Sequence, residues 1–271
     1  NSTMGSADMC EQRQPTRAGA QLAGALEVIE REAYMVMWLN QLTLPKYATS
    51  SIIARFPSLA KHFATCERYH LKTHVIKLPT DAPTHVVAVV LEDTNGNIPR
   101  FTIGIRSHRS LPTAIEKAMT EALRSLRGYR HWINAGNTWD NTTPVQKIGH
   151  RDRLYYWSEP ENAKHLEFMI AGNEIEVETR EWEHDTIEEN LQRVIQWCTD
   201  NQFECISIPL TGSKKNPTDL HIEMVVMPQL LPTYLNEQAQ EFGSSRWSDV
   251  PRLLGYTPRS QPFASRPHPF S

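Results

Sequence analysis

The segment GALEVIEREAYMVMWL, at positions 24–39, carries three acidic side chains, Glu27, Glu30 and Glu32, directly before an apolar run. A helix turns by about 100° per residue, so Glu27 and Glu30 are neighbours beside the apolar stripe, whereas Glu32 points almost opposite and is expected in solvent. Two adjacent carboxylates repel each other unless a cation or hydrogen-bond donors lie between them. Carboxylate oxygens at this spacing suit Mg2+, above all Mg2+ that already carries nucleotide phosphates.

Arg31 follows the acidic pair directly, and its guanidinium could bind a phosphate through two hydrogen bonds. The alternative is that Glu27 and Glu30 form a solvated helix flank, since polar helix edges are the norm. Spacing alone leaves both interpretations open. The chain has no G-x-x-x-x-G-K-S/T motif, so ATP binding here would not use a Walker loop.

Other candidate residues each have a structural alternative. His108 could touch substrate or make only a local hydrogen bond, and Trp132 and Trp139 could form a stacking surface for a peptide or anchor a loop. The acidic stretch 181–190 lacks the spacing of metal ligands and is expected to be a solvated helix start. The cysteines form no C-x-x-C pair and neighbour no histidine in a nucleophile pattern, so we expect them to pack in the interior.

The bulk composition is that of a globular protein. The 271 residues are 39% hydrophobic and 22% charged, and they are sufficient for a large core. The formal net charge of −3 gives no general attraction to nucleic acid or to anionic membranes. No apolar run approaches the ~20 residues that span a bilayer, and no signal peptide is evident. We therefore expect a cytoplasmic protein without nucleic-acid or membrane partners.

Hydrophobic periodicity predicts a mixture of helices and strands. The predicted helices cover 16–42, 51–69, 111–128, 161–171 and 186–200, and the predicted strands cover 73–78, 85–92, 98–105, 205–210 and 221–227. The sequence Asn95-Gly96 predicts a hairpin turn, and 129–149 predicts a loop. This pattern indicates an α+β (mixed α/β) fold with a largely antiparallel sheet packed against helices.

Four motifs, in this order, resemble the YcaO family. ALEVIEREAYMVMWL (25–39) is similar to the family's second E-x-x-E-R helix, and GIRSHRSLPTAIEKAMTEALRSL (104–126) is similar to its glycine-led strand end and Ala-rich helix. VVMPQLLPTYLNEQAQEFGSSRW (225–247) resembles the family's late strand-Pro-helix and arginine segment. The final RPHPFS resembles the Pro-rich end of azoline-forming members. The resemblance extends over essentially the whole chain.

The resemblance implies an ATP- and Mg2+-dependent cyclodehydratase that activates backbone amides of a ribosomal precursor peptide to form thiazolines or oxazolines. It implies that ATP is bound by Glu27, Glu30, Arg31, Glu121 and Arg124. Among these, the three glutamates would hold metal, and the two arginines would be catalytic. The implied partners are the precursor peptide and a leader-binding protein, for example one like a ubiquitin-activating enzyme. A homodimer or hetero-complex is expected.

The resemblance also divides the chain in two. Residues 1–255 would form a YcaO-like ATP-dependent domain, and residues 256–271 would form a Pro-rich tail. In azoline-forming members such a tail lies near the active site. The residues of this tail expected to lie there are Pro267, His268 and Pro269.

The chain departs from the family pattern at several positions. No segment matches the family's earlier S-x-x-x-E-x-x-E-R helix, so we expect that the N-terminal part of the domain is missing or belongs to another chain. Arg124 stands where the family has Gln, and Ser271 stands where it has a final Pro. An Asn and an acidic residue usual in the family are replaced near Pro15 and Gly19. Two alternatives therefore stay open: a non-catalytic accessory or scaffold subunit, and a thioamide- or amidine-forming variant.

Overall fold

The computed structural model describes residues 10–140, 142–178, 185–210, 220–234, 237, 243–263 and 265–269. The helices are α1 (Arg17–Asn40), α2 (Thr49–Arg55), α3 (Ala60–Arg68), α4 (Leu111–Asn134), α5 (His150–Ser158), α6 (Pro160–Ala163), α7 (Glu167–Ile170), α8 (Ile187–Asp200) and α9 (Arg246–Leu253). Short 3-10 turns cover η1 (Pro57–Leu59), η2 (Val145–Lys147) and η3 (Lys164–Leu166). The strands are β1 (Cys10–Gln14), β2 (Lys46–Tyr47), β3 (Leu71–Lys77), β4 (His85–Asp93), β5 (Phe101–His108), β6 (Glu174–Ile175), β7 (Ile206–Pro209) and β8 (His221–Val226).

The strands form two sheets. One has the order β5-β4-β3-β2-β6, and all its neighbours are antiparallel except β2 and β6. The other has the order β1-β8-β7 and is antiparallel throughout. The predicted fold class, α+β with a largely antiparallel sheet, is confirmed.

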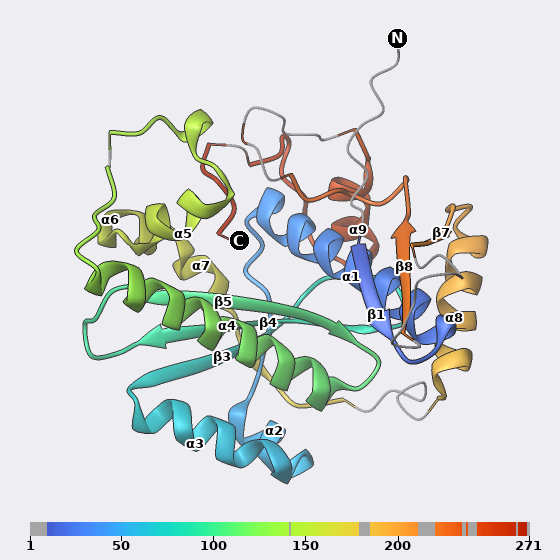
Figure 1. Cartoon of the computed structure of the whole chain (residues 1–271), viewed down its shortest axis with the longest axis horizontal. Coiled ribbons are helices and arrows are strands. Elements are labelled where there is room, and N and C mark those ends of the chain that lie inside the picture. Colours follow the sequence, from blue (N-terminus) through green and yellow to red (C-terminus); the bar gives the residue numbers. More distant parts are fainter. Residues whose placement is uncertain are drawn as a thin grey trace.

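Helices cover both faces of the larger sheet. The apolar residues of β4 alternate between two apolar clusters, so that Val87 and Val89 pack with α4 and α3, whereas Ala88 and Val90 pack with α1. In Figure 1, α4 runs alongside β4 and β5, and α1 lies on the other side of these strands. Because β5 is the outermost strand of this sheet, α1 and α4 flank its edge from opposite faces. No helix in the described part of the chain is both long and apolar enough to cross a bilayer.

The prediction of one continuous helix over 51–69 is wrong. α2 ends at Arg55, because a residue before proline is disfavoured in helical conformation, and Phe56 takes φ −129° and ψ 75° before Pro57. The turn η1 then leads into α3. The prediction over 161–171 is similarly too regular, since the chain there is divided among α6, η3 and α7.

The region after β4 also differs from its prediction. The hairpin turn is confirmed, with Gly96 at φ 80° and the Asp93 carboxylate accepting from Asn95 N at 2.9 Å. The following strand begins at Phe101, three residues later than predicted, and ends at His108. Beyond it, α4 continues past its predicted end into the predicted loop, as far as Asn134.

Candidate functional site

The candidate site lies at the outer edge of β5, where α1 and α4 each contribute a carboxylate. Because β4 pairs with only one side of β5, the N–H groups of Ile105 and Ser107 point outward. Glu121 Oε2, from α4, accepts from Ile105 N at 2.8 Å, and Glu30 Oε2, from α1, accepts from Ser107 N at 2.5 Å. Two helices on opposite faces therefore place their acidic groups along one strand edge.

The spacing of these two carboxylates follows from the strand. Alternate residues of a strand are roughly 7 Å apart, which is too far for two carboxylates to enclose a bare ion closely. Within the described ranges, no group of three or more His, Cys, Asp or Glu residues could hold a metal ion. Protein-bound Mg2+ often takes only one or two carboxylates and completes its shell with water and substrate phosphates. The donor set therefore fits Mg2+ that arrives with phosphates.

Burial makes the ionised carboxylates costly. Glu30 is 5% exposed, and this burial raises its pKa to about 8 against the opposing effects of Arg106 and the Ser107 N–H. Burial also raises the pKa of Glu121, although the Ile105 N–H and nearby arginines oppose it. The solvated-flank alternative is therefore wrong for Glu30. A bound cation would relieve this cost for both carboxylates.

Arg106 brings a basic group to the same place. It lies with Glu27 and Glu30 on a cavity of about 160 Å³, which Lys117 of α4 also lines. The buried Nε of Arg106 has no hydrogen-bond partner among the described residues. A guanidinium next to acidic side chains, with a donor unused, suits a phosphate oxygen held between them.

The structure brings the predicted ATP-site residues together. Arg31 Nη2 donates to Glu27 Oε1 at 2.8 Å, one helical turn away on α1. Arg31 and Arg124 both lie close enough to Glu121 for their charges to lower the pKa of its carboxyl. The assignment of these residues to ATP, metal or catalysis stays a prediction.

Gly104 allows α4 to approach β5 closely enough for this arrangement. A Cβ added to Gly104 would lie 2.1 Å from Ala118 O and 2.7 Å from Ala122 N, both backbone atoms of α4. We expect Gly104→Ala to displace α4, to weaken the bond from Glu121 to Ile105, and to lower the free energy of unfolding by about 2 kcal/mol or more. Urea unfolding measures this loss.

Gly128→Ala, on α4, is the control, because a Cβ there meets nothing within 4 Å apart from the adjoining backbone of its own helix. Since alanine is favoured over glycine inside a helix, this control should gain roughly 0.5–1 kcal/mol. Equal effects of the two substitutions would contradict the close-approach argument.

Sequence reasoning did not identify Arg106 or Lys117. The strand predicted over 98–105 ends just before Arg106, so the alternation of side chains was not extended to it. A strand placed three residues later would put Gly104, Arg106 and His108 on one face. This two-residue alternation of side chains is the sequence signal that could have identified Arg106.

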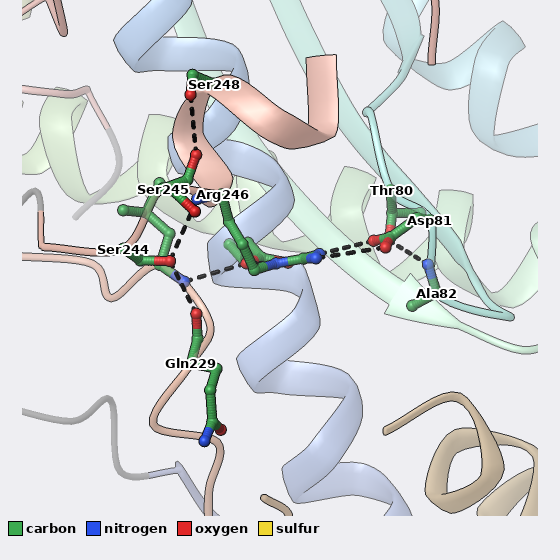
Figure 2. Close-up of polar contacts among 10 residues, drawn as sticks. Thr80, Asp81, Ala82, Gln229, Ser244, Ser245, Arg246 and Ser248 are labelled. Atoms are coloured by element: carbon green, nitrogen blue, oxygen red, sulfur yellow. Dashed lines mark hydrogen bonds and ion pairs between the residues drawn. The ribbon is translucent and has the colours of Figure 1, made fainter. Parts of the chain in front are cut away.

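Glu32 is not in solvent as predicted, because it is 2% exposed and paired with Arg246 of α9. Arg246 Nε donates to Glu32 Oε1 at 2.6 Å and Arg246 Nη2 donates to Glu32 Oε2 at 2.7 Å. Arg246 Nη2 also donates to Asp81 Oδ1, between β3 and β4, at 2.6 Å (Figure 2). The guanidinium lies over the rings of Phe203 and Trp197. Glu32, the residue after Arg31, thus joins α1 through Arg246 to α9 and to the segment between β3 and β4.

The Pro-rich tail is packed into the protein over its described residues. His268 is fully buried, and its Nε2 lies 2.7 Å from Arg153 Nη1 and 2.8 Å from Tyr234 O. Trp157 Nε1 donates to Pro267 O at 3.1 Å. These contacts join the tail to α5 and to the segment after β8.

One ring contact and one shared cavity relate the tail to the helices of the candidate site. The His268 ring meets the Tyr34 ring with centroids 6.0 Å apart, and Tyr34 lies one turn beyond Glu30 on α1. Pro269 lines a small cavity with Ser125 of α4. A role of Pro267, His268 and Pro269 in the active site stays a prediction.

The remaining candidates are mostly structural. His108 accepts a local hydrogen bond from Ser110 N at 2.9 Å, as its alternative predicted, although it also lines the cavity beside Glu30. Trp132, which lies in α4 and not in a loop, stacks on Tyr155 of α5 with centroids 3.7 Å apart, and Trp139 lies 6.4 Å from the same ring. A stacking surface for a peptide stays a prediction.

Two further predictions concern packing and the acidic stretch. Cys66 and Cys198 are buried, as expected, and Cys205 is only partly buried against the core. Of the acidic stretch 181–190, residues 181–184 lie outside the described residues. The remainder begins α8 with a capping box between Thr186 and Glu189.

Comparisons with known proteins concern the family and the fold of the chain. Residues 15–231 match a family model described as YcaO cyclodehydratase, ATP- and Mg2+-binding. No curated protein matches the sequence. The prediction of ATP and Mg2+ as cofactors is confirmed at the level of the family.

Solved structures share the fold. A heterocyclase in complex with substrate and cofactor matches with a TM-score of 0.70 and 19% identity, over 96% of this chain and 33% of that one. The E. coli microcin synthetase McbBCD complex with pro-MccB17 bound matches with a TM-score of 0.66 and 14% identity, over 96% and 62%.

A third similar structure is that of YcaO from Methanopyrus kandleri bound with AMPPCP and Mg2+. It has a TM-score of 0.61 and 16% identity, over 81% of this chain and 54% of that one. The present chain thus spans about a third of the length of the first heterocyclase. Because the family model matches most of the sequence and the fold agrees, this chain belongs to the YcaO family.

Proposed function

We propose that the chain is the ATP-dependent part of a cyclodehydratase that converts Cys, Ser or Thr residues of a ribosomal precursor peptide into thiazolines or oxazolines. The observation that supports this most is the pair of carboxylates from α1 and α4 on adjacent outward N–H groups of β5. Arg31, Arg106 and Arg124 surround this pair with the positive charge that a triphosphate requires.

The proposed reaction uses ATP to remove the elements of water from the peptide. A side-chain thiol or hydroxyl gives up its proton to solvent and attacks the preceding carbonyl carbon. The amide oxygen then takes the γ-phosphoryl group from ATP, and ADP is the leaving group. Loss of that oxygen as phosphate, together with the amide proton, leaves the azoline ring. Glu27, Glu30 and Glu121 would each offer oxygens to Mg2+ that arrives with the nucleotide phosphates, and this Mg2+ would neutralise phosphate charge.

The arginines would position the nucleotide. Arg106, whose Nε is unused, would bind a phosphate oxygen, and Arg31 and Arg124 would stabilise the charge that develops on the transferred group. The position of Arg124, exposed on α4, allows its side chain to turn toward a phosphate.

The proposed assembly includes more than this chain. The substrate would be a precursor peptide, presented by a leader-binding partner protein, in a homodimer or hetero-complex in the cytoplasm. The tail residues Pro267, His268 and Pro269 would form the wall of the active site next to Tyr34.

Calorimetric titration of the protein with ATP and Mg2+ tests the nucleotide site. We expect the wild type to bind and Glu30→Gln to bind at least about 10-fold more weakly, because the amide keeps the bond to Ser107 but loses the charge that attracts Mg2+. Gln substitution of Glu116, an exposed residue on α4, is the control and should bind normally.

Mass spectrometry of peptides incubated with ATP tests the chemistry through the loss of one water per ring. Absence of ATP binding by the wild type, with its co-purified partner present, would support the accessory-subunit alternative. ATP binding with sulfur or nitrogen incorporation, and no loss of water, would support the thioamide or amidine alternative. Unchanged ring formation after deletion of residues 266–271 would argue against a role of the tail.

A further inference from the structure

The first half of β3 has an open edge. β2 pairs with β3 only through Lys46 opposite Ile76 and Tyr47 opposite Val75, and the chain then leaves the sheet to begin α2. In the described part of the molecule, no strand continues β2 alongside the residues of β3 that precede Val75. Among the described residues, the strand position in line with β2 is therefore vacant.

Hydrogen bonds at the end of β3 show which backbone groups face this position. Lys77 N donates at 3.0 Å to the carbonyl oxygen of Pro45, which directly precedes β2. Leu78 N instead donates at 2.9 Å to Val86 O of β4. Because these directions alternate along a strand, the backbone N–H and C=O groups of odd-numbered residues of β3 point toward β2, and those of even-numbered residues point toward β4. The N–H and C=O groups of Leu71 and Thr73 thus face the vacant position.

A cavity of about 500 Å³ lies along the same edge, far from Glu30 in the sheet order. On the face of the sheet that α3 covers, Phe63 and Tyr47 line the cavity and belong to the same apolar cluster as Leu71. On the other face it is lined by Lys72, whose side chain is exposed. Lys46 and the exposed carboxylates of Glu67 and Glu174 line it as well. The cavity therefore has an apolar wall, charged groups of both signs and a row of backbone groups.

We propose that this groove binds an extended segment of the precursor peptide as an added strand, antiparallel to β3 and in line with β2. Two alternate residues of the segment would exchange N–H···O bonds with Thr73 and Leu71. Their side chains would face Phe63, and the side chain between them would face Lys72. Because Lys72 is the residue directly opposite the middle side chain, and Glu67 and Glu174 lie elsewhere along the lining, the preferred segment is apolar-acidic-apolar. The proposal rests on the proposed function, which supplies a peptide as substrate.

The test uses the whole chain and a synthetic acetylated hexapeptide with the central sequence Val-Glu-Val. Hydrogen exchange measured by NMR should show protection of the Leu71 and Thr73 amides on addition of the peptide. The Lys72 amide, which points to β4, should not change. N-methylation of both valines should weaken binding by about 10-fold or more, because it removes the two donors that face β3.

N-methylation of the central glutamate is the matched control and should leave affinity within about twofold, since that N–H points away from β3. Lys72→Glu, an exposed substitution, should reverse the preference toward Val-Lys-Val. Equal weakening by both kinds of methylation, or protection only at the amides beside Glu30, would overturn the proposal.

The outcome is separable from that of the proposed function. Glu30→Gln should still bind the hexapeptide normally, because Glu30 lies at the opposite edge of the sheet. Ring formation without protection at Leu71 and Thr73 rejects only the groove. Protection without ATP-dependent ring formation by the wild type rejects only the cyclodehydratase proposal, and the groove is then a peptide site of different purpose.

Discussion

Raising the pH from about 5 to about 8 should lower the free energy of unfolding of the metal-free protein by roughly 3–4 kcal/mol through Glu30 alone. Burial raises the pKa of Glu30 from 4.5 to about 8, so over this range the folded protein keeps a proton that the unfolded chain has released. Unfolding then releases a proton, and stability falls as the pH rises. The contribution is complete below about pH 4.5 and lost above about pH 8.

Glu30→Gln should remove this part of the decrease, because a neutral amide does not titrate and its oxygen still accepts from Ser107 N. Above about pH 7 the variant should therefore be more stable than the wild type. Thermal unfolding in EDTA across the range measures both proteins. Glu116→Gln, which changes an exposed carboxyl on α4, should keep the wild-type slope. An unchanged slope in Glu30→Gln would contradict the assignment of the proton to Glu30.

The parts of the site that could be predicted are those set by local periodicity. The apolar spacing within α1 and α4 places Glu27, Glu30 and Glu121 correctly along their helices. Their meeting at one strand edge is different, because it depends on the register of β5 and on the close approach that Gly104 allows. Periodicity within a helix contains no information about either.

Glu32 shows where the helical wheel fails. A projection of the helix at about 100° per residue gives the direction of each side chain relative to the apolar stripe. It assumes that the side opposite the stripe faces solvent. α1 has no such solvent side, because it is buried nearly all round between Leu22 and Asn40. The group that neutralises Glu32 is Arg246, which is 214 positions later in the chain. Only the tertiary structure could reveal that pair.

The tail shows the same limit. Pro-rich composition is typical of an extended linker, yet His268 is fully buried against Arg153. Arg153 has 0% exposure and donates to both Glu237 Oε1 and Tyr234 O. Because α5 itself was not predicted, its arginine could not be recognised as the partner of the tail.

Replacing Arg246 with Met should lower the free energy of unfolding by about 3–5 kcal/mol, because the carboxylates of Glu32 and Asp81 then lose their only cation among the described side chains. Urea unfolding at neutral pH measures this loss. Arg252→Met is the matched control on α9, since its ion pair with Asp249 is exposed and should contribute less than about 1 kcal/mol.

Further variants of the same cluster test whether Arg246 stabilises the protein through its charge or through its packing. The pKa of Glu32 is already raised by burial, with Arg246 opposing that shift, so Arg246→Met should raise it further and the variant should regain stability as the pH falls. Adding Glu32→Gln and Asp81→Asn to Arg246→Met should likewise recover much of the loss, because neutral amides cost less to bury than unpaired carboxylates. If the triple variant were as unstable as Arg246→Met alone, the packing of Arg246 against Phe203 and Trp197, and not its charge, would account for the effect.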